Sequence, residues 1–194
     1  MIKGVRIFDT ILDSGNRKDT VTRNSADFWK PFCAASGWKF SYERVHSLSD
    51  LQFFLNKKIS EDVIIFSGHG DNNDGFHLSN GDVLNGDENQ LICPSKNHGK
   101  IIIFSSCLMG KNDDLMDDIY ALFSPMAVFA YTDVIHDKYC FLYESILLTM
   151  LEHKYVKGTS RISQEFFWDF QDETMFMKNM NKKFVNNHPM EFFA

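Results

Sequence analysis

Two short apolar runs, each ending in small residues and one reactive side chain, are the clearest features of the hydrophobic pattern. The first, DVIIFSGHG at residues 62–70, places His69 between two glycines. The second, KIIIFSSCLMG at residues 100–110, places Cys107 after two serines. Short continuous apolar runs bounded by turn residues are typical of buried strands in a parallel sheet. Because the carboxyl ends of parallel strands share one edge, we expect the histidine and the cysteine to lie at the same edge.

The rest of the chain alternates between strand and helix patterns. Further strands are expected at residues 4–9, 38–45 and 126–132. Helical spacing of apolar residues predicts helices at residues 25–35, from 47 or 49 to 55, from 112–114 to 123, at 139–153 and at 161–176. Ser25 and Ser160 are expected to cap helices, and Pro31 is expected to kink or break the first one. This alternation predicts one α/β domain over residues 1–194, with a mostly parallel sheet and helices on both faces.

The connection between the two reactive strands has a hairpin pattern. In GFHLSNGDVL, residues 75–84, Asn80-Gly81 separates two short apolar segments, which is a strong signal for a tight β-turn. Residues 85–99 are expected to form a loop or one short helix. Residues 177–194 are mostly polar, and Phe184, Phe192 and Phe193 are the expected docking points of that segment.

Charge and cysteine usage narrow the class of protein. The 20 Lys and Arg residues against 26 Asp and Glu residues give a net charge of −6, and no basic run offers a nucleic-acid footprint. No apolar run approaches the roughly 18 residues of a membrane span. Met1 to Arg6 contains no apolar secretory segment, so we expect a cytoplasmic protein whose four cysteines are reduced.

The histidine and the cysteine together favour nucleophilic catalysis. A thiol attacks a carbonyl as its thiolate. A charged His69, and the positive end of a helix beginning just after Lys111, would both favour the thiolate of Cys107. Gly70 would let the backbone approach a substrate oxygen with no side chain in the way.

The order of these features resembles the caspase-like cysteine peptidases of clan CD, most closely the bacterial CHAT-type peptidases. The resemblance covers a strand ending in His69-Gly70, the hairpin, a strand ending in Ser106-Cys107, and AVFAY at residues 127–131 followed by an apolar helix and KGTS at 157–160. It implies a caspase-like fold in which His69 is the general base or acid and Cys107 is the nucleophile. The backbone N–H groups of Gly70 and Cys107 would form the oxyanion hole. We expect a protein or peptide substrate and no metal or cofactor.

Substrate preference and regulation follow less directly. Asp9 and Asp133 end the first and fifth predicted strands, so both are expected at the reactive edge, where a carboxylate would favour Arg or Lys before the cut. Asp also commonly caps turns, which is the alternative for both residues. By analogy with the family, activation by a ligand, by processing or by a partner protein is expected, and a role in defence or cell death.

Other functions remain open or are excluded by missing motifs. A catalytically silent caspase-like domain that binds a partner or a small signalling ligand is the main alternative. A nucleotide or flavin site lacks its glycine-rich motifs, and an α/β-hydrolase lacks its G-x-S-x-G elbow. A zinc site at Cys93, His98 and Cys107 lacks a fourth ligand. Cys33 and Cys140 are expected in the core, and Cys93 is expected in a loop. His77 and His136 are expected at the surface.

Overall fold

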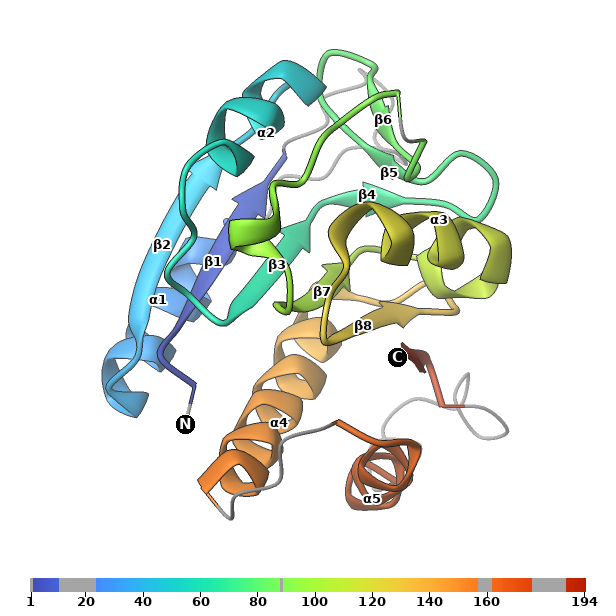
Figure 1. The fold of residues 1–194 in the computed structure, drawn as a ribbon. Coiled ribbons are helices and arrows are strands. Elements are labelled where there is room, and N and C mark those ends of the chain that lie inside the picture. The colour runs from blue at the N-terminus through green and yellow to red at the C-terminus, as the bar shows by residue number, and fades with distance from the viewer. Residues whose placement is uncertain (1, 11–23, 88, 157–161, 176–187) are drawn as a thin grey trace.

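The computed structural model describes the chain except residues 1, 11–23, 88, 157–161 and 176–187. A six-stranded sheet with the order β2-β1-β3-β7-β8-β9 lies at its centre (Figure 1). Its strands are β1 (Gly4–Asp9), β2 (Lys39–Arg44), β3 (Val63–Ser67), β7 (Ile101–Ser105), β8 (Ala127–Tyr131) and β9 (Met190–Phe193). The first five pair in parallel and β9 pairs antiparallel with β8, so the prediction of a mostly parallel sheet is confirmed.

Helices cover both faces of the sheet, as the alternation of strands and helices predicts. One face packs against α1 (Ser25–Ser36), α4 (Asp137–Val156) and α5 (Gln164–Glu173). The other packs against α2 (Leu48–Leu55) and α3 (Asp113–Phe123). A small antiparallel sheet of β4 (His69–Gly70), β5 (Phe76–His77) and β6 (Val83–Leu84) lies on that second face and contains the predicted hairpin.

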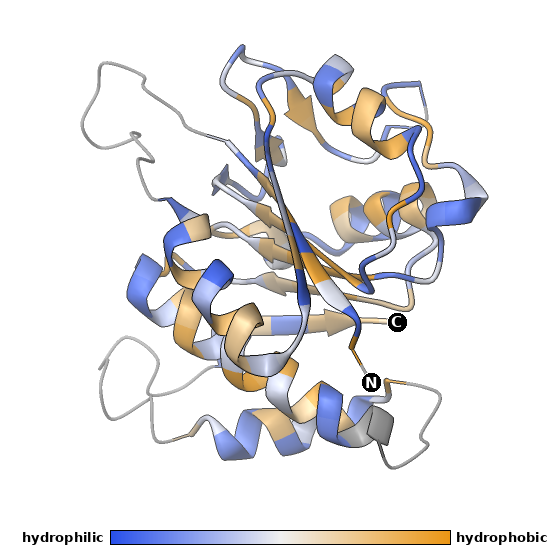
Figure 2. Cartoon of the chain, turned by 90° about the vertical axis from the view of Figure 1, so that its left-hand side faces the viewer, coloured by the Kyte–Doolittle hydropathy of each residue, from blue (hydrophilic) through white to orange (hydrophobic). Residues whose placement is uncertain are grey.

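The two apolar clusters follow from the alternation of side chains along each strand. Ile65 and Ile103 face the α1 and α4 side, whereas Phe66 and Phe104 face the α2 and α3 side. The rings of Phe66 and Phe104 stack with centroids 5.0 Å apart. In Figure 2 the central strands are accordingly the most hydrophobic part of the fold, and the outer sides of the helices are hydrophilic. No helix in the described part of the chain is long and apolar enough to cross a membrane.

The ends of α1 and α2 agree with the sequence prediction except at the first residue of α1. Asn24, not Ser25, caps α1, because its side chain accepts the N–H of Ala26. Pro31 lies inside α1 without ending it, and Gly37 closes the helix in the left-handed conformation. Ser47 caps α2 and forms a reciprocal capping box with Asp50.

The last part of the chain departs most from its prediction. Ser163 caps α5, while the predicted cap Ser160 and the docking residue Phe184 lie outside the described residues. Residues 190–193, predicted as part of a polar segment, form the edge strand β9. Phe192 packs onto the cluster beneath α4 and α5, with its ring 5.3 Å from that of Phe129, as a docking residue would.

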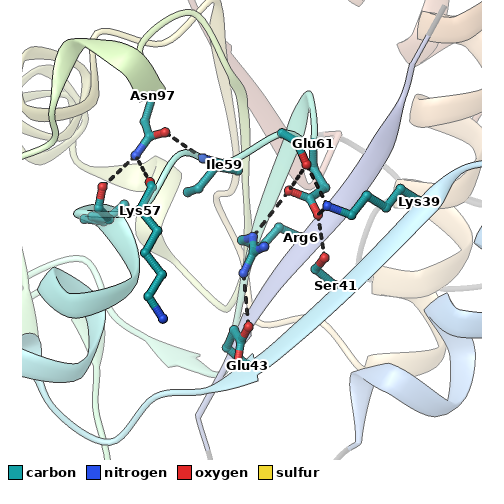
Figure 3. Close-up of polar contacts among 10 residues, drawn as sticks. Arg6, Lys39, Ser41, Glu43, Lys57, Ile59, Glu61 and Asn97 are labelled. Atoms are coloured by element: carbon teal, nitrogen blue, oxygen red, sulfur yellow. Dashed lines mark hydrogen bonds and ion pairs between the residues drawn. The ribbon is translucent and has the colours of Figure 1, made fainter.

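Two polar networks fix the segment between α2 and β3 (Figure 3). Glu61 is fully buried, and it accepts a hydrogen bond from Ser41 and pairs with Lys39 at 2.9 Å and with Arg6 at 3.5 Å. Burial alone would raise the pKa of Glu61, but Ser41, Lys39 and Arg6 outweigh it and lower this pKa to about 2. Asn97 donates to the carbonyls of Leu55 and Lys57 and accepts the N–H of Ile59.

Candidate active site

The carboxyl ends of β1, β3 and β7 carry a row of buried polar residues. Asp9, Ser67 and Ser105 are register partners across these three strands, and each is at most 1% exposed. His69 and Cys107 each follow two residues after one of the serines. The prediction that the two apolar runs form neighbouring parallel strands is therefore confirmed. His69 and Cys107 both follow the carboxyl ends of these strands, at the same edge of the sheet.

The sequence predicts that the first apolar run ends in His69, but β3 ends at Ser67 and His69 is not part of it. It lies on β4, in the small second sheet, and Gly68 separates it from β3. A Cβ atom added at Gly68 would collide with Cγ2 of Thr10 and lie 3.1 Å from the ring of Phe76. Gly68 is therefore needed where the chain passes from one sheet to the other.

Gly70 brings the backbone beside His69 onto the segment that carries Cys107. A Cβ atom added at Gly70 would lie 2.8 Å from Oγ of Ser106 and 3.0 Å from the carbonyl oxygen of Cys107. Ser106 is 2% exposed, and in the described part of the chain its Oγ has no hydrogen-bond partner. The backbone of Gly70 therefore lies close to the segment that carries Cys107.

Cys107 lies at a sharp change of chain direction. Its thiol is half-buried and donates to the carbonyl oxygen of Ile135 at 3.8 Å. Leu108 has a φ of 63°, a left-handed conformation that is uncommon for residues other than glycine and recurs at functional sites. One 3₁₀ turn, η2 (Met109–Lys111), then leads to α3.

The helix predicted to begin just after Lys111 is present, and its first turn is acidic. Helix α3 begins at Asp113, within the predicted range of 112–114, and Asn112 caps it. Its first turn carries Asp113 and Asp114, which already complement the positive end of the helix.

A second histidine, His77, lies beside His69. The sequence predicts His77 at the surface, away from the site. His77 is the register partner of His69, and the two ring centroids are 5.3 Å apart. The side chain of His77 is 23% exposed, and its Nε2 lies 2.6 Å from Oδ2 of Asp71. Only the pairing of β4 with β5 brings the two histidines together, and β4 has two residues and no sequence pattern of its own.

The two predicted substrate carboxylates lie in different surroundings. Asp9 is fully buried, and its Oδ2 accepts a hydrogen bond of 2.7 Å from the hydroxyl of Tyr42. Asp133 is partly exposed, and its Oδ1 accepts the N–H of Val134. Asp133 lies two residues before Ile135, whose carbonyl contacts the Cys107 thiol. The loop after β8 therefore reaches the segment that carries Cys107.

The other cysteines are buried. Cys33 and Cys140 belong to the core, as predicted, and Cys93 lies in a loop but is 7% exposed. Burial raises the pKa values of the Cys33 and Cys93 thiols to about 11. Cys107 is the most accessible of the four thiols.

Two further features lie near this edge of the molecule. A cleft of about 910 Å³ between α3 and residues 85–98 includes neither His69 nor Cys107 in its lining. In the described part of the chain, one group of three side chains could bring ligand atoms together for a metal, namely Asp71, Asp74 and His77. The set of Cys93, His98 and Cys107 does not come together in this way, and His98 instead contacts the carbonyl of Cys93.

Comparison of the chain with models of protein families and with curated proteins finds no match. The function is therefore argued from the fold and the site alone.

Proposed function

We propose that the chain is a cysteine endopeptidase that uses Cys107 as nucleophile and His69 as general base and acid. The observation that carries this proposal is the contact of the Gly70 backbone with the Ser106–Cys107 segment, at the shared edge of β3 and β7. Through this contact Gly70, the residue after His69, lies against the segment of Cys107, although the two segments follow different strands.

The proposed reaction runs in two stages. His69 takes the proton of Cys107, and the sulfur attacks the peptide carbonyl carbon, whose oxygen becomes an oxyanion bound by the N–H groups of Gly70 and Cys107. The C–N bond then breaks as His69 gives its proton to the leaving amine. In the second stage His69 takes a proton from water, the hydroxide attacks the thioester, and the C–S bond breaks to release the acid and the thiolate.

A basic residue before the cut is the proposed preference. Asp9 lies in the buried row with Ser67 and Ser105, and Asp133 lies on the loop that contacts Cys107. A carboxylate that is shielded from water binds Arg or Lys through charge-assisted hydrogen bonds. Asp133 is partly exposed, so a substrate can reach it directly. Asp9 is fully buried, so a substrate can reach it only if the residues around it move.

A fluorogenic peptide library tests the activity and the preference together. The wild type should cleave after Arg or Lys, and Cys107→Ala should cleave nothing. Either Asp9→Asn or Asp133→Asn should lose cleavage after Arg by about a hundredfold, while reaction of Cys107 with neutral iodoacetamide is retained. Cleavage that persists in Cys107→Ala would exclude the proposed nucleophile, and a profile dominated by Asp or by large apolar residues would exclude the basic preference.

A further inference from the structure

His77 and Asp71 form a hydrogen-bonded pair next to His69, outside the two residues assigned to catalysis. Strands β4 and β5 are antiparallel, and His69 lies directly opposite His77. The neighbouring Phe76 is fully buried in the core. Because successive side chains of a strand point to opposite faces, His77 points away from that core, on the same face as His69.

Asp71 is held by the turn that joins β4 to β5. Its Oδ1 accepts the N–H groups of Asn73 at 2.8 Å and Asp74 at 2.7 Å, and its own N–H donates to the carbonyl of Gly75. Gly75 has a φ of 121°, and a Cβ atom there would lie 2.5 Å from the carbonyl oxygen of Leu84. Three hydrogen bonds to the backbone of the turn therefore hold Asp71 in place.

The charge of Asp71 decides which group donates the hydrogen bond between Asp71 and His77. Burial alone would raise the pKa of Asp71, but the N–H of Asp74, the His77 ring and the N–H of Asn73 lower it below its ordinary value. The carboxylate is thus ionised at neutral pH, and its Oδ2 accepts a hydrogen bond of 2.6 Å from Nε2–H of His77. An imidazole with one nitrogen bound to a fixed carboxylate keeps one ring orientation.

We propose that His77, held by Asp71, is a positioning residue that keeps the His69 ring oriented toward Cys107. The fixed ring of His77 packs against His69 with an interplanar angle of 47° and limits the rotamers open to it. General base and acid catalysis depends on such orientation, since the proton must pass over hydrogen-bond distance at each step. This inference rests on the proposed function, and His77 acts through His69 rather than on the substrate.

The kinetic test compares His77→Phe and Asp71→Asn with the wild type on one peptide substrate. His77→Phe keeps a ring but loses the hydrogen bond, and Asp71→Asn keeps the acceptor for the turn but removes the charge. Both should lower kcat by about tenfold or more with KM within about twofold, since orientation acts on the chemical step. His46→Phe is the matched control, because His46 contacts Ser79 at the tip of the hairpin. EDTA in the buffer removes any metal that Asp71, Asp74 and His77 bind.

A spectroscopic test needs no turnover. The ¹⁵N ring signals of His69, identified by their loss in His69→Ala, should shift or broaden in both test variants relative to the wild type, because the ring loses its fixed orientation. If peptides are cleaved but kcat is unchanged in both variants, the positioning role is wrong and the peptidase stands. If no peptide is cleaved yet the His69 signals depend on His77, the proposed function fails and the positioning role stands. Unchanged His69 signals in both variants overturn the inference.

Discussion

The four thiols of this chain differ in burial, and that difference predicts their reactivity. The raised pKa values of Cys33 and Cys93, about 11 each, keep these thiols protonated at neutral pH. Iodoacetamide at pH 7.5 should therefore modify one site in the folded wild type, and peptide mapping should locate it at Cys107. In Cys107→Ala this labelling should disappear, whereas Cys140→Ala should retain it. Rapid labelling of Cys93 in the native protein would contradict this order.

His69 is the second residue whose role can be isolated. His69 lies opposite His77 on β4 and is only half-buried, so we expect its replacement to leave the core in place. His69→Ala should keep the unfolding midpoint of the wild type and lower kcat by about 10²–10⁴. The double variant with Cys107→Ala should be no less active than Cys107→Ala alone, because the two residues act as one unit. A folded His69→Ala protein with normal kcat would show that another group is the base.

At the scale of elements, the strands with strong patterns and the hairpin with its Asn80-Gly81 turn were predictable, whereas β4 and β9 were not. Strands β3 and β7 are continuous apolar runs, so their sequence alone indicates two buried neighbours. Strands β4 and β9 have two and four residues, too few for a period, and pairing with β5 and β8 defines them. The candidate residues His69 and Cys107 could thus be found from the sequence, but the contact of His77 with His69 could not.

The close approach of β4 to the Cys107 segment gives an element-scale prediction. In Gly70→Ala the new Cβ would meet Ser106 and Met109 at 2.8 Å, so either β4 or the segment that carries Cys107 must shift. We expect kcat/KM to fall by about 10²-fold or more, the typical effect of losing one oxyanion donor. Gly4→Ala is the control, since it creates a similar collision with Lys39 far from the site. Equal loss of activity in both variants would show a general packing effect.

Strand β9 supplies the second element-scale prediction. Met190 is fully buried and pairs with Tyr131 at the carboxyl end of β8. Met190→Ala should lower the free energy of unfolding in urea by about 2–5 kcal/mol, because it leaves a cavity in the core. Glu191→Ala, at an exposed position of the same strand, should change it by less than about 0.5 kcal/mol. A similar small effect in both variants would mean that β9 contributes little to the fold.

At the scale of the whole molecule, the buried Glu61 links stability to pH. Its pKa is about 2 in the folded chain against an ordinary 4.5, so the unfolded chain binds a proton more readily between these values. The stabilisation is complete above about pH 4.5 and is lost as the pH falls toward 2, and it amounts to roughly 3 kcal/mol. Urea titrations at several pH values should show this loss in the wild type.

The matched variants isolate the contribution of Glu61 from that of other carboxylates. Glu61→Gln should be less stable at pH 7 and should lose less stability than the wild type between pH 4.5 and pH 2. Glu43→Gln removes a carboxylate that is 33% exposed and also pairs with Arg6, so its effect should be much smaller. A wild-type slope retained in Glu61→Gln would assign the acid sensitivity to other groups.

The central claim is that His69 and Cys107 form one catalytic unit, and a peptidyl electrophile tests it most directly. A peptidyl acyloxymethyl ketone with Arg at the reacting position should add one equivalent by intact mass, and peptide mapping should locate it at Cys107. His69→Ala should slow this addition by about 10²-fold or more, and His46→Phe should leave it unchanged. Addition to another cysteine, or at the wild-type rate in folded His69→Ala, would contradict the account.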